Sequence, residues 1–391
     1  MRVLIHDFGA YAFPVTLSQA LQDRGYDVGH AYCNSLVTTP HNVCEGSGGF
    51  TLLPVQTSRP LNKYNLVQRW IQEQEYGRLA TRVILNFNPD VVISANAPLS
   101  AQERILRSCK QNDIPFVFWL QDLIGLATSR VLKSKLPLLS SAIGCYFQLL
   151  EGRLLRKSDA VISITEDFIP ALRKFGVVPD CCHVIENWGT LGRFEGNPST
   201  WARKNDLNQR PILLYAGTLS MKHNPATLQH LAQQLGSRAQ IVVVSQGAGA
   251  DWLTKAIAEH NLNNLTVLPY QEADQLPAMY ASAQLLLVLL TEDAGQFSVP
   301  SKVLTCLCAG RPILAAIPRE NLAARIIENS GAGFIMDPND HIGFAQKAQL
   351  LLDEPELCQT IGESAQKWAD DQFEIGKIAD QFEHVLKQAS A

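Results

Sequence analysis

The strongest constraint on the fold is a regular alternation of short apolar runs with longer amphipathic stretches. Amphipathic segments such as Pro14–Arg24 and Ser100–Asn112 separate the runs of the first half. The runs that we interpret as strands there are Val3–Phe8, Val28–Cys33, Leu52–Val55, Val91–Ser94, Phe116–Leu120, Val161–Ile164 and Val184–Glu186. Strands that alternate with helices form parallel sheets with helices on both faces. The sequence therefore predicts a doubly wound α/β domain.

The alternation pauses at Asn187–Arg210, which lacks a clear period and is predicted to be a linker. It then restarts with the predicted strands Ile212–Ala216, Ile241–Ser245, Leu265–Leu268, Leu285–Leu290, Ile313–Ile317 and Phe334–Met336. Helices are predicted at Pro225–Leu235, Asp251–His260, Leu276–Ser282, Ser301–Ala309 and Leu322–Asn329, followed by a helical tail from His341 with a break at Pro355. Two such domains facing each other place a ligand cleft at the carboxyl ends of their strands.

Composition excludes several classes of protein. A chain of 391 residues with 46% hydrophobic residues supports two cores and is not a disordered polymer. The chain has a net charge of -4, so it lacks the excess of basic residues that is typical of a nucleic-acid-binding protein. No apolar run reaches the roughly 18 residues of a membrane span, and a strand pattern from residue 2 leaves no room for a signal peptide. The nine cysteines lack zinc-site spacing, so we expect reduced thiols in a cytoplasmic protein.

Three loops that follow strands of the second half are candidates for nucleotide binding. Backbone N–H groups at Gly217 and Thr218, together with Lys222, are suited to a diphosphate, although a surface lysine would also fit this loop. Gln246 and Gly247 permit close contact with a nucleotide or form a simple flexible turn. Tyr270 either packs beside a base or caps the core. Neither a Walker A motif nor a D-x-D carboxylate pair occurs.

The most distinctive stretch runs from Thr291 to Leu304 and leads into a helix that begins near Pro300. First-turn N–H groups, here those of Ser301–Val303, are unsatisfied within a helix and favour an anion. Lys302 opposes the helix dipole, and a negative ligand would explain its presence there. Glu292 is a candidate for binding sugar hydroxyls, and a solvated loop with an incidental lysine is the alternative.

The first half offers fewer candidates. Gly9, in the loop after the first strand, either lets the backbone approach a phosphate or serves the turn alone. The absence of G-x-G-x-x-G argues against NAD. Asp122 ends a buried strand and is either a base or hydroxyl binder, or a helix N-cap. His6, within a strand, is expected to be a satisfied core residue.

Residues 131–157 contain an uncharged stretch, Leu136–Leu150, with basic residues on both sides. An interfacial helix on anionic lipid has this pattern, and so has a buried core helix. We therefore carry both interpretations forward.

Several motifs together resemble glycosyltransferase family 4, which has the GT-B fold. They are Gly217-Thr218-Leu219 with Lys222, Gln246-Gly247-x-Gly249, Pro300-Ser301-Lys302 and Ala309-Gly310-Arg311-Pro312. A closer resemblance is to the bacterial subgroup that adds fucose-type or N-acetylfucosamine-type sugars in colanic-acid and O-antigen assembly. Leu120-Gln121-Asp122, Ile185-Glu186-Asn187-Trp188 and Val299-Pro300-Ser301-Lys302 carry this closer match.

The resemblance implies an acceptor-binding domain at 1–190, a nucleotide-sugar-binding domain at 191–365 and a helix at 366–391 that crosses back to the first domain. It implies metal-independent transfer without a cofactor, usually with retention of anomeric configuration. Gly9, Lys222 and the Ser301–Val303 turn would face the diphosphate, and Tyr270 and Gln246 would lie near the base.

One departure from the family pattern concerns the donor. The family carries E-x7-E before the Ala-Gly-x-Pro stretch, where this chain has Phe297 and Thr305. Thr305 offers a weaker contact to the ribose, and Phe297 cannot replace a carboxylate at the sugar. Glu292 or Asp293 are the candidates to replace that contact, and a deoxy sugar would be consistent with fewer hydroxyls to bind.

The sequence thus predicts a glycosyltransferase that moves a sugar from a nucleoside-diphosphate sugar to a lipid-linked or saccharide acceptor for a cell-surface polysaccharide. Asp122, Lys222 and Lys302 are the predicted catalytic residues. We expect a cytoplasmic protein, peripheral on the inner membrane surface through residues 131–157, with no nucleic-acid partner. A sugar-nucleotide epimerase on a similar scaffold and a catalytically silent nucleotide-binding scaffold are the two rival hypotheses.

Overall fold

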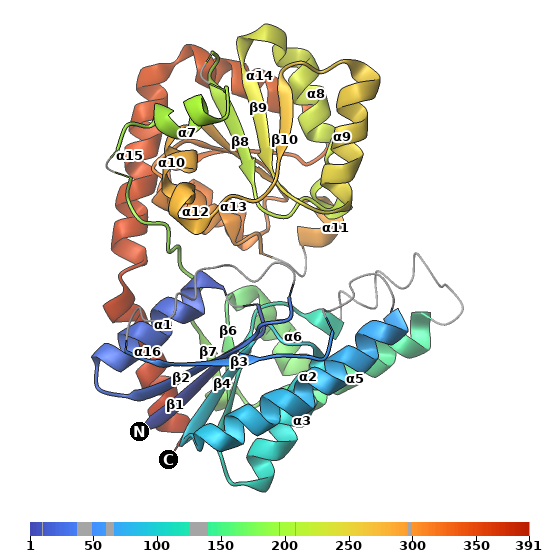
Figure 1. Cartoon of the computed structure of the whole chain (residues 1–391), viewed down its shortest axis with the longest axis vertical. Helices are drawn as coiled ribbons and strands as arrows, with labels where there is room; N and C mark the ends of the chain where they lie inside the picture. The colour runs from blue at the N-terminus through green and yellow to red at the C-terminus, as the bar shows by residue number, and fades with distance from the viewer. Residues whose placement is uncertain are drawn as a thin grey trace. The chain divides into compact units, whose positions relative to one another are not determined.

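The computed structural model describes residues 1–9, 11–36, 49–59, 66–125, 140–194, 196–207, 209–295 and 299–390. The chain divides into two compact units (Figure 1). Unit 1 comprises Met1–Asn187 and Glu374–Ala391, and unit 2 comprises Trp188–Phe373. In the described part of the chain, no helix is long and apolar enough to cross a bilayer.

Unit 1 is built on a seven-stranded parallel sheet in the order β3-β2-β1-β4-β5-β6-β7. Its strands are β1 (Arg2–Asp7), β2 (Asp27–Cys33), β3 (Thr51–Val55), β4 (Val91–Ala95), β5 (Phe116–Leu120), β6 (Ala160–Ser163) and β7 (Cys182–Val184). Its helices are α1 (Ala12–Asp23), α2 (Leu66–Phe87), α3 (Leu99–Gln111), α5 (Ser140–Lys157), α6 (Ile169–Lys174) and α16 (Ile375–Ala389). The strand order reverses between β1 and β4, where ligands bind in open α/β sheets.

Unit 2 is built on a six-stranded parallel sheet in the order β10-β9-β8-β11-β12-β13. Its strands are β8 (Ile212–Ala216), β9 (Gln240–Val244), β10 (Leu265–Leu268), β11 (Leu285–Leu289), β12 (Ile313–Ala316) and β13 (Gly333–Met336). Its helices are α7 (Ser199–Lys204), α8 (Ala226–Leu235), α9 (Ala248–His260), α10 (Leu276–Ala281), α11 (Glu292–Gly295), α12 (Lys302–Cys308), α13 (Leu322–Ser330), α14 (His341–Asp353) and α15 (Pro355–Gln372). The order reverses here between β8 and β11.

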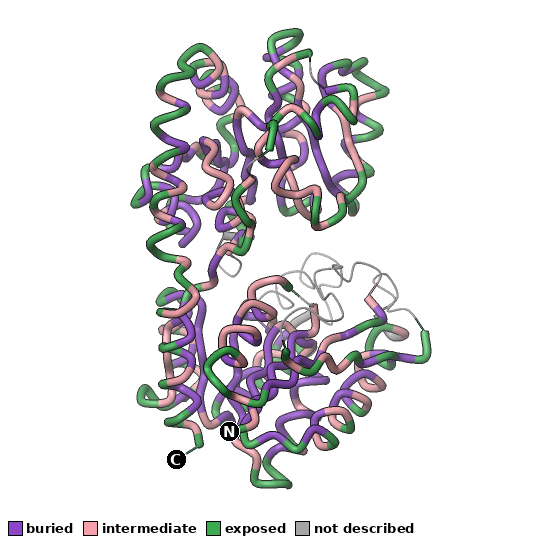
Figure 2. The backbone as a smooth tube through the Cα atoms, turned by 60° about the vertical axis from the view of Figure 1, so that its left-hand side comes forward, coloured by how far each residue is buried: buried purple, intermediate pink, exposed green. Residues whose placement is uncertain are grey.

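The central strands are apolar along their whole length because helices cover both faces of each sheet. All five residues of β4, β5 and β11 are buried. Figure 2 shows buried backbone through the middle of each unit and exposed backbone on the outer helices. Every predicted strand overlaps an observed one, so the prediction of two doubly wound domains is confirmed.

The predicted linker Asn187–Arg210 is wrong in one respect, because it contains the short helix α7. Trp201 of this helix is buried in the core of unit 2, and its indole nitrogen donates to Gln271 Oε1 at 3.0 Å. Burial of Trp201, together with Ala202 and Leu207, therefore orders a segment whose local sequence lacks a helical period.

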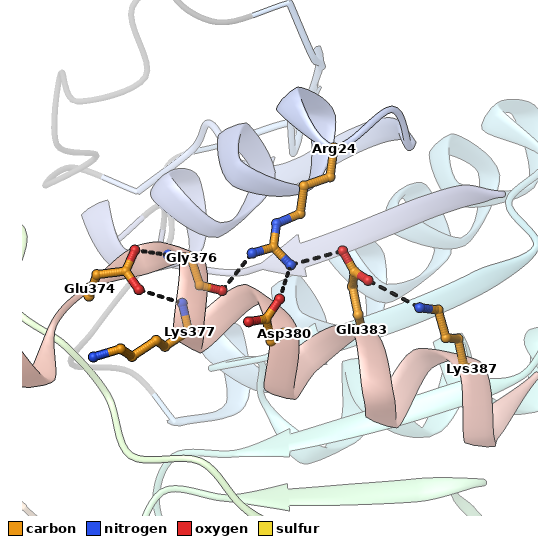
Figure 3. A network of polar contacts seen from close by, with 7 residues as sticks. All are labelled: Arg24, Glu374, Gly376, Lys377, Asp380, Glu383 and Lys387. Carbon is orange, nitrogen blue, oxygen red and sulfur yellow. Dashed lines mark hydrogen bonds and ion pairs between the residues drawn. The ribbon is translucent and has the colours of Figure 1, made fainter.

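The C-terminal helix α16 returns to unit 1, as predicted, and packs on α1 and β5. Phe382 is fully buried, with its ring centroid 4.9 Å from that of Trp119. Figure 3 shows the polar side of this contact, where the Arg24 guanidinium donates to Asp380 (2.6 Å), Glu383 (3.0 Å) and the Gly376 carbonyl (2.6 Å). The Glu374 side chain caps the first turn of α16.

Candidate active site

Four loops at the carboxyl edge of the unit 2 sheet are joined by hydrogen bonds. The loops after β8 and β9 exchange two backbone bonds, from Leu219 N to Gln246 O (3.3 Å) and from Gly249 N to Leu219 O (2.9 Å). Thr218 Oγ1 lies 2.8 Å from Tyr270 Oη, which follows β10. The structure thus brings together Thr218, Gln246 and Tyr270, three predicted residues that follow different strands.

The loop after β11 joins the same group, because Thr291 N donates to the Lys222 carbonyl at 2.9 Å. Glu292 and Asp293 follow directly on the short helix α11, and both are exposed. Thr305 is half-buried on α12. Phe297, the other residue at the family's glutamate positions, lies outside the described residues.

The glycines of these loops are required by the backbone. Gly217 and Gly247 have φ angles of +114° and +113°, a region that residues with a Cβ atom rarely adopt. A Cβ atom at Gly249 would lie 2.8 Å from the Leu219 carbonyl oxygen. Substitution at any of the three would displace the loop backbone.

Lys302 reaches back from the start of α12 to the end of β8. Its Nζ donates to Tyr215 Oη and lies 3.8 Å from the centroid of the Tyr215 ring. A Cβ atom placed on Gly217 would be 3.8 Å from the same Nζ. The lysine side chain therefore lies directly beside the glycine loop that was predicted to hold a diphosphate.

The electrostatics of this edge favour an anion. Burial lowers the pKa of Lys302 to about 7, and the Lys222 ammonium contributes in the same direction. Burial, followed by the two ammonium groups, lowers the pKa of His223 to about 3, so the imidazole is neutral. Its Nδ1 accepts the Ser220 N–H at 3.0 Å. Lys222 is thus close enough to disfavour the charge of Lys302, and a bound anion would relieve this effect.

One of the three N–H groups that were predicted to be unsatisfied at Ser301–Val303 is hydrogen-bonded within the turn. Val303 N donates to the Pro300 carbonyl (3.1 Å), and Leu304 N donates to that of Ser301 (3.0 Å). Ser301 has helical backbone angles, so a tight turn precedes α12 and satisfies these N–H groups. Val303 N–H is therefore not an unsatisfied donor, and the Lys302 side chain supplies a positive charge at this position.

In unit 1, Gly9 is held by a buried carboxylate that the sequence analysis did not single out. Asp7 Oδ1 accepts from Gly9 N (3.3 Å) and Asn96 Nδ2 (2.8 Å), and Oδ2 accepts from Tyr11 N (2.5 Å). Burial raises the pKa of Asp7 to about 6, against the opposing effect of these hydrogen bonds. The carboxylate joins the loops after β1 and β4, on either side of the point where the strand order reverses. An acidic residue at the very end of an apolar strand was the signal that could have revealed it.

Asp122 is exposed in the turn that follows β5, where its carbonyl accepts the Ile124 N–H at 3.0 Å. Beside it, Gln121 exchanges two hydrogen bonds with the Asn187 side chain, at 2.6 and 3.3 Å. The buried Glu151 of α5 accepts the Gly125 N–H at 3.1 Å, and burial raises the pKa of Glu151 to about 7. Glu151 too was missed, because nothing local distinguishes it from a surface glutamate.

The prediction for His6 is confirmed. It is buried, with Nδ1 2.7 Å from Ser94 Oγ and Nε2 2.8 Å from Tyr76 Oη. Burial lowers the pKa of His6 to about 3, so it is a neutral, hydrogen-bonded core residue.

Two parallel α/β units, with a last helix that returns from the second to the first, form the architecture of GT-B glycosyltransferases. Residues 9–188 match glycosyltransferase family 4, and residues 199–368 match glycosyl transferases group 1. The chain therefore carries both domains of this class of glycosyltransferase. The fucosyl subgroup, the epimerase and the catalytically silent scaffold remain hypotheses.

Known proteins agree with this assignment. Alpha-D-kanosaminyltransferase of Streptomyces kanamyceticus is 23% identical over 247 residues, which cover 61% of this chain and 62% of that enzyme, less than two thirds of its length. The structure is similar to sucrose-phosphate synthase from Thermosynechococcus elongatus, with a TM-score of 0.76, 16% identity, and coverage of 99% of this chain and 98% of that one. Anabaena HepE in complex with UDP-glucose gives a TM-score of 0.70 and 15% identity, with 99% of both chains covered.

Proposed function

We propose that this glycosyltransferase moves a sugar from a nucleoside-diphosphate sugar to a lipid-linked saccharide during cell-surface polysaccharide biosynthesis. The observation that carries the donor proposal is the pair of lysines, Lys222 and Lys302, beside the Gly217–Thr218 loop. The UDP-glucose complex of the similar HepE structure supports a donor of this class.

The two lysines would lower the main energy barrier of the reaction, which is the departure of the diphosphate. Negative charge grows on the leaving diphosphate as the sugar gains oxocarbenium character, and fixed cations stabilise that charge without reorganising. Removing one preorganised donor of this kind typically costs about 3 kcal/mol of barrier, or about a hundredfold in rate. Lys302 is fixed by Tyr215 before the donor arrives, so we assign it the larger share of this stabilisation.

The remaining residues receive roles by their position. Tyr270 and Gln246 lie on the loops beside Gly217, where they would contact the nucleoside. Glu292 and Asp293 follow the strand next to β8 and present exposed carboxylates that would bind sugar hydroxyls. Thr305 would contact the ribose, and Ser301 would lie near the diphosphate.

In unit 1, Gly9 would approach the diphosphate through its backbone, and Asp122 would orient the acceptor hydroxyl. We propose retention of anomeric configuration without a metal ion. The leaving phosphate would then take the acceptor proton, and Asp122 would align the acceptor and not ionise it.

A panel of UDP-glucose, GDP-fucose and dTDP-glucose in a thermal-shift assay tests the donor proposal. A stabilising shift with one of them is expected, and it should be lost in Lys302→Ala. Lys255→Ala, which removes an exposed lysine of α9 in the same unit, is the matched control and should keep it. No shift with any of the three in the wild-type chain would refute the donor class. A preference for GDP-fucose would support the fucosyl subgroup.

The proposed lipid-linked acceptor draws support from the surface of α5. Its exposed side chains include Cys145, Tyr146 and Leu149 in the first half, and Arg153 and Arg156 in the second. Tyr146 and Leu149 are 56% and 62% exposed. Of the segment predicted to meet the membrane, residues 131–139 lie outside the described residues. The described part therefore combines an apolar, aromatic end with a basic end, as interfacial helices do.

A liposome flotation assay tests this surface. We expect binding to vesicles that contain anionic lipid, and its loss in the double variant Tyr146→Asp, Leu149→Asp. Ile342→Asp is the control, because Ile342 is an equally exposed apolar residue in unit 2. Flotation that the double variant leaves unchanged would argue against α5 as the contact.

A further inference from the structure

Tyr215 forms a hydrogen-bonded junction that the proposed function does not use. It is the fourth residue of β8 and is fully buried. Its Oη accepts a hydrogen bond from Lys302 Nζ and donates one to the Thr218 carbonyl oxygen at 3.0 Å. A phenol has one proton and free lone pairs, so both bonds form at once. The hydroxyl proton of Tyr215 is donated to the Thr218 carbonyl, so the lone pairs of the same oxygen accept from the Lys302 ammonium.

This junction connects elements that lie far apart in sequence. Lys302 comes from α12, whereas Thr218 belongs to the loop after β8 and contacts Tyr270 Oη through its own hydroxyl at 2.8 Å. A continuous chain therefore runs from Lys302 through Tyr215 and Thr218 to Tyr270. The other three members are assigned to the donor, and Tyr215 is the one through which they are joined.

The groups around Lys302 explain why its ammonium needs support. Lys222 disfavours its charge, and His223 is neutral. Cys306 of α12 favours the charged form of Lys302, but burial raises the pKa of this thiol to about 12, so it carries no full negative charge. Burial also raises the pKa values of Tyr215 and of Tyr280 from α10. The hydroxyl oxygen and ring of Tyr215 contact the ammonium directly, and both contacts favour the charged form of Lys302.

We propose that Tyr215 is a positioning residue for the donor, which holds the Lys302 ammonium and the Gly217–Thr218 backbone in the arrangement that receives the diphosphate. This inference rests on the proposed function, since it takes the diphosphate as the ligand of that loop. It goes further than that function because it proposes that Tyr215, which contacts no substrate, fixes the position of Lys302 and favours its charged form.

Tyr215→Phe tests the proposal, because it deletes both hydrogen bonds and keeps the ring. The probe is whichever of UDP-glucose, GDP-fucose and dTDP-glucose binds the wild-type chain, and its affinity is measured by calorimetry from about pH 6 to pH 9. The diphosphate of these probes keeps a constant charge over the range, and comparing variant with wild type at each pH cancels any ionisation of the base. The difference between the two profiles therefore belongs to the protein. We expect about tenfold weaker binding near pH 7 and a shift to lower pH of the point where affinity begins to fall. Tyr280→Phe removes a second buried hydroxyl from the same unit and should leave both properties unchanged.

If Tyr215 served only to stabilise the fold, Tyr215→Phe would weaken binding by the same factor at every pH. A double-mutant cycle adds a second criterion: Tyr215→Phe should cost little further affinity when Lys302→Met is already present. Should Tyr215→Phe fail to fold, Tyr215→3-fluorotyrosine keeps the shape and weakens the acceptor oxygen, and the same shift in pH dependence is expected. If the folded Tyr215→Phe variant binds the probe with wild-type affinity and a wild-type pH profile, the positioning role of Tyr215 is refuted and the proposed function stands. Failure of the wild-type chain to bind any of the three probes would overturn the proposed function as well.

Discussion

Asp7 gives a quantitative test of how unit 1 holds the loops that follow β1 and β4. The carboxyl group is fully buried at the end of β1 and accepts hydrogen bonds from Gly9, Tyr11 and Asn96. Burial nevertheless raises its pKa from 3.8 to about 6. The folded chain therefore binds this proton more tightly than the unfolded chain does, so ionisation of Asp7 lowers the stability of unit 1 as pH rises.

The magnitude follows from linkage between protonation and folding. A difference of about two pKa units corresponds to about 3 kcal/mol when the whole titration is traversed. The loss begins near the unfolded pKa and is complete above the folded one. Between about pH 4.5 and pH 7.5, Asp7 should lower the free energy of unfolding by about 2 kcal/mol.

Two histidines act in the opposite direction over the same range. Burial lowers the pKa values of His6 and His30 to about 3 and about 4, so both make the chain more stable as pH rises toward their unfolded values. The wild-type curve alone is therefore not diagnostic. The measured quantity must be the difference between wild type and Asp7→Asn, in which the histidine contributions cancel.

The assay is urea denaturation followed by circular dichroism at a series of pH values. The free energy of unfolding of wild type minus that of Asp7→Asn should fall by about 2 kcal/mol from pH 4.5 to pH 7.5. Asp113→Asn serves as the control for the substitution itself, since Asp113 is an exposed aspartate of the same unit. A difference that is constant with pH, or that rises, would refute the argument that burial dominates the ionisation of Asp7.

Two further predictions concern the donor site and the returning helix. Because the pKa of Lys302 is about 7, the affinity for a nucleotide sugar should fall by up to about tenfold per pH unit above that value. The side chain of Lys302→Arg stays charged, so this variant should show no such dependence in calorimetric titrations. In the contact between α16 and the rest of unit 1, Phe382→Ala should cost about 3 to 5 kcal/mol, whereas Arg24→Ala should cost about 1, since its ion pairs lie at the surface. Equal costs in urea denaturation would contradict the view that packing, not charge, holds α16 in place.

The sequence was sufficient to predict both sheets because the information is local and repeated. A parallel strand covered on both faces must be apolar along its length, so β4, β5 and β11 are visible in the sequence without any partner. The loops of unit 2 were visible for a similar reason. Glycines and a lysine directly after such strands must lie at one edge of the sheet, as Gly217, Gly247 and Lys222 do.

What could not be predicted depends on burial by distant segments. Trp201 orders α7 in a stretch without period, and only the folded unit shows the core that receives it. Ser301–Val303 was expected to offer free N–H groups, but the turn begins at Pro300, whose carbonyl accepts the N–H of Val303. Glu151 has the sequence environment of a surface residue and is buried under the loop that follows β5.

Asp7 shows most clearly why register matters for such a site. In the β1–β4 pair it lies opposite Ala95, so the next residue of the β4 strand, Asn96, is the first that can turn back toward it. The φ angle of Asn96 is +56°, a conformation that asparagine tolerates better than most residues, and its amide donates to Asp7 at 2.8 Å. A shift of one residue in this pairing would separate the two side chains and leave a buried carboxylate with fewer donors. The same strand pairing that defines the reversal of strand order thus also fixes the loops on either side of it, and with them Gly9, which we propose approaches the diphosphate.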